Sequence, residues 1–261
     1  MIYGEENVKN IKEDYAEIDH IYTRLMLKLS DLRLKLTNER AREYLVQGVC
    51  RRLNILTRCI HNIFKIFPVE KTDLLPRDDL TDLDINLHAF FINISGILDN
   101  LGWVFVYEND LFGSRKEGKI PKREVGLFNK KTQIHLKPEL NNYLKSEIIE
   151  TWYTEYSKNY RDALAHRIPL YVPPSALNKE QQEEYMLLKK QLWDFNSSEA
   201  ISQHDEIRDK LSKLGQACPC FAYSLNEEND PMFLHAQVLV DFVTIKEIID
   251  KFCDYFKQQN L

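Results

Sequence analysis

Glycine and proline are scarce in this chain, and cysteines are few. The 261 residues include 8 glycines and 9 prolines, too few for the frequent tight turns of a β-rich protein. The cysteines are odd in number and lack the spacing of a disulfide framework: Cys50, Cys59, Cys218, Cys220 and Cys253. We therefore predict a helical protein with reduced thiols, as in a cytoplasm.

Long apolar runs and an excess of positive charge are also missing. The net charge is −5, which argues against a surface coated with phosphate-binding groups. The most apolar stretch, residues 89–107, is interrupted by polar side chains that include Asn93 and Asp99, so a membrane span is not expected. The first ten residues contain no basic region followed by an apolar one, so no secretory signal is expected. These absences predict a soluble, cytoplasmic protein with no membrane partner.

Apolar side chains recur at helical spacing along most of the chain. Five long helices are predicted, over about residues 8–36, 39–67, 82–107, 139–167 and 234–256. The first has alternating steps of three and four over about four heptads, which gives a narrow apolar seam. The third is apolar almost all round, as in the centre of a bundle, and either Thr81 or Asp82 is its expected cap. Its Gly96 and Gly102 predict close approach of a neighbour.

Two segments interrupt this helical pattern. Residues 108–138 form a predicted basic excursion with two β-like pieces, VGLF and TQIHL. Residues 172–231 form a predicted, partly helical insertion, in which Asn178 and Gln181 have the spacing of a capping box. A helix through about Trp193, a second from Ser197 or Ser198 and a brief strand at CPCFAYSL are expected there. The prediction is one all-α domain over residues 1–261, a helical bundle with both segments inserted into it.

The stretch NYRDALAHRIPLYVPP, residues 159–174, ends the fourth predicted helix. Glu155, Asn159, Asp162 and His166 recur at steps of four, three and four, opposite an aromatic stripe. A carboxylate one turn from an imidazole can orient it, and the helix C-terminus favours its charged form. Arg161 lies beside this row and could hold a phosphate through two nitrogens.

These groups suit cleavage of RNA without a metal, because the 2′-hydroxyl of the substrate is itself the nucleophile. The protein has only to move protons and to stabilise charge on the phosphoryl oxygens. The same polar row is also what an ordinary amphipathic surface helix shows, with Arg and His as partners of its dipole. The spacing alone leaves both interpretations open.

The segment RDALAH, residues 161–166, resembles the signature of the HEPN superfamily (higher eukaryotes and prokaryotes nucleotide-binding domain): Arg, a polar residue, three variable residues, His. The order of predicted helices agrees, and RIPLYVPP together with LHAQVLVDF resembles an uncharacterised bacterial branch. The resemblance covers the first four helices and the last, and leaves out the excursion and the insertion.

This resemblance implies a helical fold that forms homodimers, with two motifs in one composite site. Active members are metal-independent endoribonucleases, many of them in toxin–antitoxin pairs or phage defence, so an antitoxin or regulatory protein is a possible partner. Arg161 and His166 would be the catalytic pair and Asp162 the orienting residue, supported by Asn159. No cofactor is implied.

The chain departs from the family at Asp162, where asparagine is usual. A carboxylate there would repel a phosphate and partly neutralise Arg161. Some members have lost catalysis, so the alternative is a non-catalytic module that binds a nucleotide, RNA or protein. Asp99 and Asn100 on the central helix are either satisfied core groups or support for His166.

Two further clusters carry weaker predictions. Seven residues of the excursion could follow an RNA backbone, although a charge run is often only a solvated loop: Arg115, Lys116, Lys119, Lys122, Arg123, Lys130 and Lys131. Cys218 and Cys220, with His204 or His235, could suggest zinc. Zinc sites usually draw on two separated ligand pairs, so we predict a thiol pair and no metal.

Overall fold

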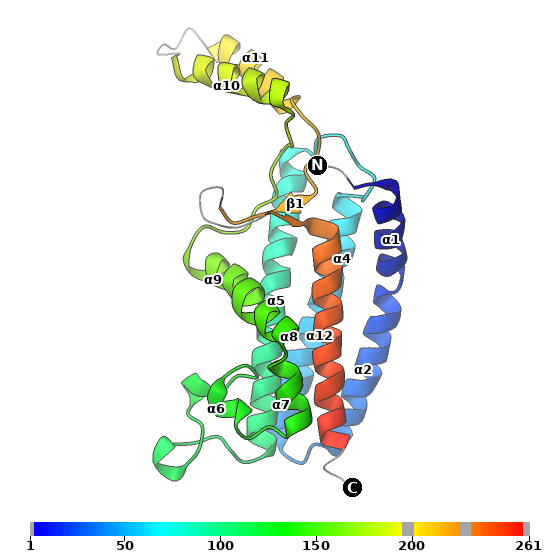
Figure 1. Ribbon diagram of the computed structural model, residues 1–261, viewed down its shortest axis with the longest axis vertical. Helices are drawn as coiled ribbons and strands as arrows, with labels where there is room; N and C mark the ends of the chain where they lie inside the picture. Colours follow the sequence, from blue (N-terminus) through cyan, green and yellow to red (C-terminus); the bar gives the residue numbers. More distant parts are fainter. Residues whose placement is uncertain (1–2, 195–200, 225–230, 258–261) are drawn as a thin grey trace.

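Long helices packed side by side form the body of the molecule (Figure 1). The computed structural model describes residues 3–194, 201–224 and 231–257. Its main helices, α-helical or π-helical (η1), are α1 (Glu5–Ala16), α2 (Ile18–Lys35), α3 (Glu39–Glu43), η1 (Tyr44–Cys50), α4 (Arg51–Ile66), α5 (Arg77–Glu108) and α12 (Leu234–Lys257). The prediction of a mostly helical protein is confirmed. The first predicted helix is divided at Glu17, whose N–H bonds three residues back instead of four.

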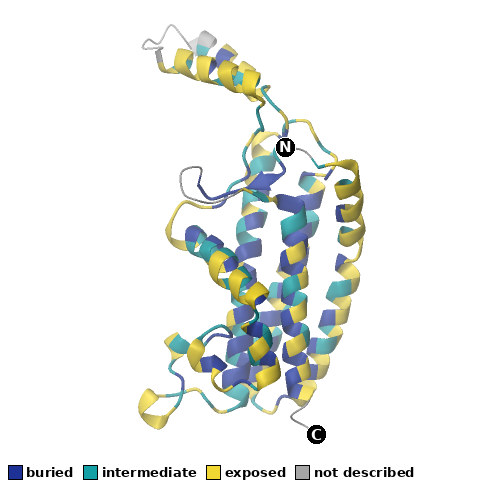
Figure 2. Cartoon of the chain, in the orientation of Figure 1, coloured by how far each residue is buried: buried dark blue, intermediate teal, exposed yellow. Residues whose placement is uncertain are grey.

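The central helix is α5, as its apolar composition predicted. Most of its apolar side chains are buried, and Figure 2 shows the buried residues concentrated along α4, α5 and α12. The predicted cap was wrong, because α5 begins at Arg77 after an extended Pro76 and the Thr81 hydroxyl bonds to the Arg77 carbonyl inside the helix. Of the helices described, α5 is long and apolar enough to cross a membrane, but 61% of its most apolar stretch is buried within the protein.

Both glycines of α5 meet a close neighbour, as predicted. An added Cβ at Gly102 would lie 2.6–2.7 Å from the backbone of Gly126 and Leu127, so the excursion rests directly on the helix. At Gly96 the neighbour is a side chain, since the Arg52 guanidinium lies about 2.4–2.5 Å from where a Cβ would be. At Gly102, where the neighbour is backbone, only a residue without a side chain permits this approach.

The excursion is packed against the bundle and holds no extended strand in its described residues. It contains the 3-10 turns η2 (Arg115–Glu117) and η3 (Lys122–Glu124) and the short helix α6 (Lys130–Gln133). The β-like interpretation of VGLF and TQIHL was wrong. Asn129 caps α6 through its side chain, and Phe128 stacks on Tyr153 at 3.9 Å, so the apolar residues contact helices instead of a strand partner.

The fourth predicted helix is broken near its start. The helix α7 (Pro138–Leu144) stops, Ser146 is extended, and a second helical stretch begins with α8 (Glu147–Thr151). It continues through a π-helical segment, η4 (Trp152–Ser157), into α9 (Lys158–His166). The prediction of one continuous helix over residues 139–167 was therefore wrong. The Ser146 hydroxyl donates to the Tyr143 carbonyl, and the first helix ends there.

The insertion is partly helical, as predicted. Its helices α10 (Lys179–Asp194) and α11 (Ile201–Ser212) project from one end of the bundle (Figure 1). The capping box is confirmed by reciprocal bonds of 3.0 and 2.8 Å between Asn178 and Gln181. Ser197 and Ser198, predicted to begin the second helix, lie outside the described residues. The brief strand is confirmed as β1 (Cys220–Phe221), which pairs antiparallel with β2 (Met232–Phe233).

Candidate functional site

The motif lies on α9, and the buried side of this helix is aromatic as predicted. Tyr160 is 3% exposed and stacks on Phe91 of α5 at 5.3 Å. Tyr156 meets the edge of the same phenylalanine at 5.8 Å. These rings fix the rotation of α9 on α5 and so decide which of its side chains face outward.

A buried carboxylate joins the motif helix to α12, and the sequence did not single it out. Asp241 is 0% exposed and accepts hydrogen bonds from Trp152 Nε1 at 2.8 Å, Tyr156 Oη at 2.7 Å and Gln237 Nε2 at 3.0 Å. Burial raises its pKa to about 6, while the three donors pull the pKa down. A lone aspartate within the apolar run LHAQVLVDF was the only trace of this contact in the sequence.

Two of those donors come from the π-helical segment η4. Trp152 and Tyr156 are four residues apart on it and reach the two oxygens of one carboxylate. π-Helical segments are rare overall, and those that occur are often found at functional sites. Here η4 anchors the stretch immediately before the motif to α12.

Arg161 lies between two carboxylates. Its Nη1 is 3.2 Å from Asp162 Oδ1, and the two side chains are 37% and 33% exposed. Asp99 of α5 lies within electrostatic reach, because burial raises the pKa of Asp99 while the charges of Arg161 and Arg52 lower it. Arg161 Nε is buried and has no hydrogen-bond partner among the described residues. The side chain as a whole is 37% exposed, so its terminal nitrogens are the ones open to solvent.

His166 is exposed on the last turn of α9. No hydrogen bond joins it to Asp162 in the part of the chain that the structure describes, because the Asp162 carboxylate pairs with Arg161. Asn159 bonds within the helix, its amide donating to the Glu155 carbonyl at 2.7 Å. His166 is thus accessible from solvent at the end of α9.

Asp99 and Asn100, the two residues of α5 predicted to support the site, have different neighbours in the structure. Asp99 lies within electrostatic reach of Arg161, while its support of His166 stays a prediction. Asn100 instead covers Gly48 of η1, where its amide nitrogen lies 2.5 Å from the place of an added Cβ. It lines a surface hollow of about 520 Å³ together with Arg51 and Arg52. Within one chain Asn100 thus serves the packing of η1 and not the motif.

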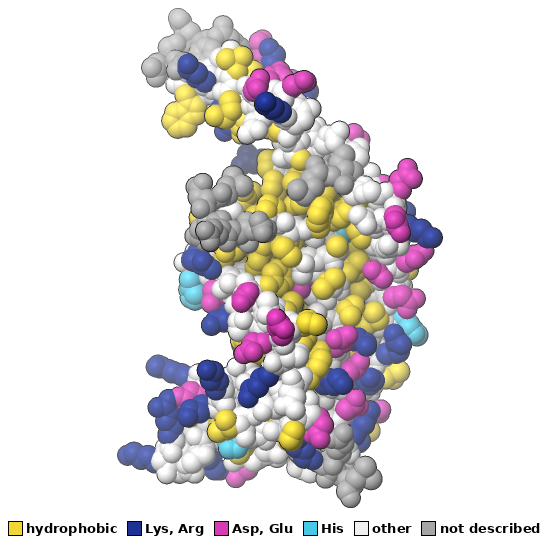
Figure 3. Space-filling view, in the orientation of Figure 1, with side chains coloured by type: hydrophobic (Ala, Val, Ile, Leu, Met, Phe, Trp, Pro, Cys, Tyr) yellow, Lys and Arg dark blue, Asp and Glu magenta, His cyan; other side chains and the backbone are white. Residues whose placement is uncertain are grey.

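The basic excursion presents its charges at one end of the molecule, where Figure 3 shows Lys and Arg side chains gathered. Lys119 pairs with Asp110 at 3.0 Å, and Arg115 pairs with Glu124. The other five residues predicted to bind RNA are exposed: Lys116, Lys122, Arg123, Lys130 and Lys131.

A hollow of about 350 Å³ opens among these basic groups, lined in part by Arg115, Lys119, Lys131 and His135. Glu124 also lines it, so the hollow is basic but not purely cationic. Figure 1 places α6 on the same side of the bundle as α9.

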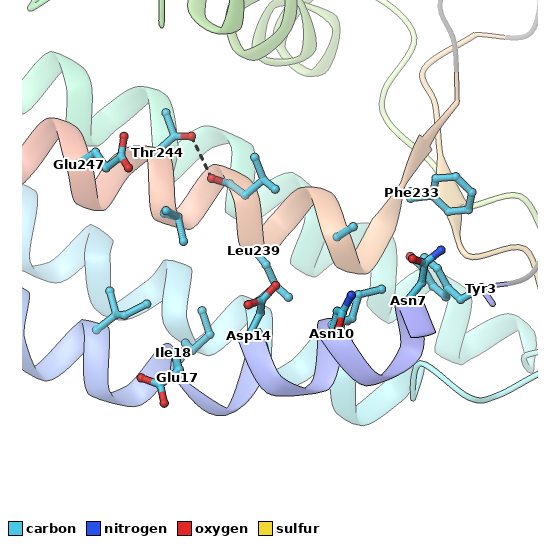
Figure 4. Close-up of a pocket in the computed structure, with 15 residues that line it drawn as sticks. Tyr3, Asn7, Asn10, Asp14, Glu17, Ile18, Phe233, Leu239, Thr244 and Glu247 are labelled. Atoms are coloured by element: carbon cyan, nitrogen blue, oxygen red, sulfur yellow. Dashed lines mark hydrogen bonds between the residues drawn. The ribbon is translucent and has the colours of Figure 1, made fainter. Parts of the chain in front are cut away.

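An apolar groove of about 630 Å³ runs between α1, α2 and α12. Ile18 and Leu239 form part of its floor, Tyr3 and Phe233 close one end, and the Thr244 hydroxyl turns back to the Val240 carbonyl at 2.9 Å (Figure 4). The groove was not predicted from the sequence. Apolar periodicity assigns residues to a face of a helix, but it does not give the distance between two packed helices.

Cys218 and Cys220, with His204 or His235, were the residues weighed as zinc ligands. Among the residues described, no group of three His, Cys, Asp or Glu side chains is placed to hold a metal ion. His235 is 0% exposed; its Nε2 donates to the Phe67 carbonyl at 2.6 Å, and its Nδ1 lies 3.3 Å from the Tyr3 hydroxyl. Burial lowers its pKa to about 4, so this histidine is neutral at pH 7.

Comparison with family models, with curated proteins and with solved structures gives no match to this chain. Function must therefore be inferred from the residues and their arrangement.

Proposed function

We propose that this protein is a metal-independent endoribonuclease of the HEPN type, with Arg161 and His166 as its catalytic pair. One observation carries the proposal. The Arg, Asp and His of the motif remain at or near the surface, while the opposite side of the same helix is occupied by the core. Groups that packing does not require are then available for a substrate.

The chemistry needs only these groups and the RNA. A base removes the proton of the 2′-hydroxyl, whose oxygen attacks the adjacent phosphorus; the 5′-oxygen leaves with a proton from an acid. His166 is suited to proton transfer because an imidazole can accept a proton at one nitrogen and donate one from the other. Arg161, whose side chain is 37% exposed, would stabilise charge on the phosphoryl oxygens. DNA lacks the attacking hydroxyl and would not be cut.

Substrate binding would extend to the basic excursion. Its exposed lysines and arginine, on the same side of the bundle as α9, supply positive charge that the acidic chain otherwise lacks. Contacts of this kind bind the RNA backbone without regard to sequence.

We propose that the active form is a homodimer. Figure 3 shows hydrophobic side chains gathered over α12, between α9 and α1. Val240 is 55% exposed and Val243 38%, and both line the apolar groove. Large exposed apolar patches commonly mark protein interfaces. A second copy covering this face would bring its own α9 alongside the first and form a composite site.

The deciding experiment incubates RNA with purified protein in excess chelator. The expected products carry 2′,3′-cyclic phosphate ends. His166→Ala should lose about 100-fold or more in cleavage rate, the usual contribution of a general acid or base, while its stability stays unchanged because the side chain is exposed. His20→Ala, on the exposed side of α2, is the matched control. Cleavage that persists in His166→Ala would falsify the proposed role.

A second candidate, a non-catalytic module that binds RNA, a nucleotide or a protein, is favoured by one observation. Arg161 lies between Asp99 and Asp162, and two carboxylates around one guanidinium oppose the approach of a phosphate. Wild-type protein that binds RNA in a filter assay but never cuts it would favour this function. A toxin or phage-defence role in the cytoplasm, with an antitoxin or regulatory partner, belongs to the first candidate and falls with it.

A further inference from the structure

The segment around Cys218 and Cys220 is held at several backbone positions. Ala217 N donates to the Thr72 carbonyl at 2.9 Å, and the Pro219 carbonyl accepts from Leu234 N at 2.8 Å. Cys220 pairs with Phe233 across the two strands, and Ala222 exchanges bonds of 2.9 and 3.1 Å with Tyr171. The two thiols therefore sit on a backbone with little freedom to separate.

The two thiol groups lie on the same side of this segment. Residues two apart in extended chain project to the same side, and the chain is extended here, because Gln216, Cys220 and Ala222 each pair with a neighbouring segment. The interaction of the two thiols lowers the pKa of Cys218, and it raises the pKa of Cys220 together with burial. Cys218 is partly exposed and Cys220 is 1% exposed. One sulfur is thus reachable and nucleophilic, and the other is protected beside it.

A metal does not explain this pair. A structural zinc site takes four ligands, and no third ligand stands near the two thiols among the described residues. His235, the histidine that follows the pair in sequence, already uses both ring nitrogens on Tyr3 and Phe67. Ordinary core cysteines also do not explain it, because the remaining cysteines are single thiols on long helices, at Cys50, Cys59 and Cys253.

We propose that Cys218 and Cys220 form a redox site, a dithiol that peroxide converts reversibly to an intramolecular disulfide. The Cys218 thiolate attacks one oxygen of hydrogen peroxide, the O–O bond breaks, and hydroxide leaves, so that Cys218 becomes a sulfenic acid. The Cys220 sulfur then attacks the Cys218 sulfur, the S–O bond breaks, and the oxygen leaves as water with the Cys220 proton. The two sulfurs together lose two electrons, and the peroxide is reduced to two waters.

Reduction follows by thiol–disulfide exchange with an external dithiol. A disulfide between residues this close in sequence closes a small ring, and strained disulfides are more easily reduced than structural ones. The geometry therefore favours a site that cycles over one that stays oxidised.

The sequence offers a direct assay. Cleavage after lysine and arginine releases residues 214–246 as one peptide, which contains Cys218 and Cys220 and no other cysteine. Reduced protein is treated with hydrogen peroxide, quenched, denatured and alkylated. The expected peptide is lighter than the reduced one by two hydrogen atoms, carries no alkyl group, and regains two alkylation sites after dithiothreitol.

Variants separate this site from general oxidation. Cys218→Ser should abolish the internal disulfide, and Cys50→Ser, which removes the other partly exposed thiol, should behave as wild type. Cys220→Ala should leave Cys218 as a sulfenic acid that a dimedone probe captures. The proposal is overturned if peptide 214–246 keeps two free thiols while Cys50 oxidises, or if only disulfides between molecules form. Circular dichroism of each variant confirms that it is folded.

Discussion

The helical stretch over residues 147–166 has a buried carboxylate on one side and a partly exposed carboxylate on the other. On one side, Asp241 of α12 is fully buried and takes three donors, two of them from this helix. On the other, Asp162 and its partner Arg161 are both partly exposed, at 33% and 37%. The fold encloses and satisfies the first carboxylate, whereas it leaves the second ion pair open to solvent.

The difference separates stability from function. A buried polar group with a complete set of partners contributes to a unique packing, and its loss leaves those partners unsatisfied. A half-exposed ion pair contributes little to stability and can be retained for what it binds. Substitutions on the two sides should therefore affect different measurements.

The largest expected effect is on stability, from Asp241→Ala. Removing the carboxylate leaves buried donors of Trp152, Tyr156 and Gln237 without an acceptor, which should cost about 3 kcal/mol or more. Asp162→Ala, the matched loss of an aspartate on the other side, should change stability by less than about 1 kcal/mol. Urea unfolding followed by circular dichroism measures both. Equal losses would remove the distinction between the two sides.

Asp241→Asn tests the same carboxylate through pH. The pKa of Asp241 is about 6 in the folded protein and about 3.9 in an unfolded chain. Between these values the folded protein holds a proton that the unfolded chain has released, so this group makes stability fall as pH rises through the window. The fall should reach about 3 kcal/mol and be absent in Asp241→Asn.

Unfolding free energies at several pH values from 4 to 7 check this second prediction. The difference between wild type and Asp241→Asn should change through the window and level off above it. A difference that stays constant with pH would show that Asp241 titrates normally. The pKa of His235 is lowered to about 4. Because His235 is present in both proteins, its effect on stability cancels in the difference between them.

The basic excursion should supply affinity without specificity. Charge reversal of Lys130 and Lys131, both exposed on α6, should weaken RNA binding roughly tenfold or more. The slope of log affinity against log salt should fall by about one for each phosphate that the variant no longer neutralises. Lys9→Glu on α1, equally exposed, is the control. An unchanged slope would mean that the charged segment is only a solvated surface.

The smallest effect, and the sharpest for function, is expected from Asp162→Asn. It removes the carboxylate 3.2 Å from the guanidinium of Arg161 and restores the residue that the HEPN signature usually carries. Cleavage should rise by a few fold, because phosphate binding no longer meets that charge. Single-turnover rates with one RNA substrate measure it. A loss of cleavage would instead assign Asp162 a positive role in orienting His166.

Local patterns predicted much of this molecule correctly. Helical periodicity located the long helices, the spacing of Asn178 and Gln181 predicted a capping box, and Gly96 and Gly102 indicated close contacts. Each of these depends on neighbours within about one helical turn or on the lack of a Cβ. Such information is present in the chain itself.

Other features escaped prediction because distant groups decide them. The π-helical segments η1 and η4 both pack against α5, and VGLF lies on Gly102 of α5 with Phe128 stacked on Tyr153. The separation of Asp99 and Asn100 follows from the rotation of α5, which turns one toward Arg161 and the other onto Gly48. Adjacent letters on a helix point about 100° apart, so only the packing determines which partner each one meets.

By itself the sequence determined a helical protein with the motif RDALAH at a helix end, because apolar periodicity and the proline at Pro169 act locally. Only the tertiary structure decided that Asp241 is buried, that Arg161 lies between two carboxylates, and that Cys218 meets Cys220 on a backbone tied to Tyr171 and Phe233. Charge and burial at a residue depend on what surrounds it in space, and that is settled when the helices pack.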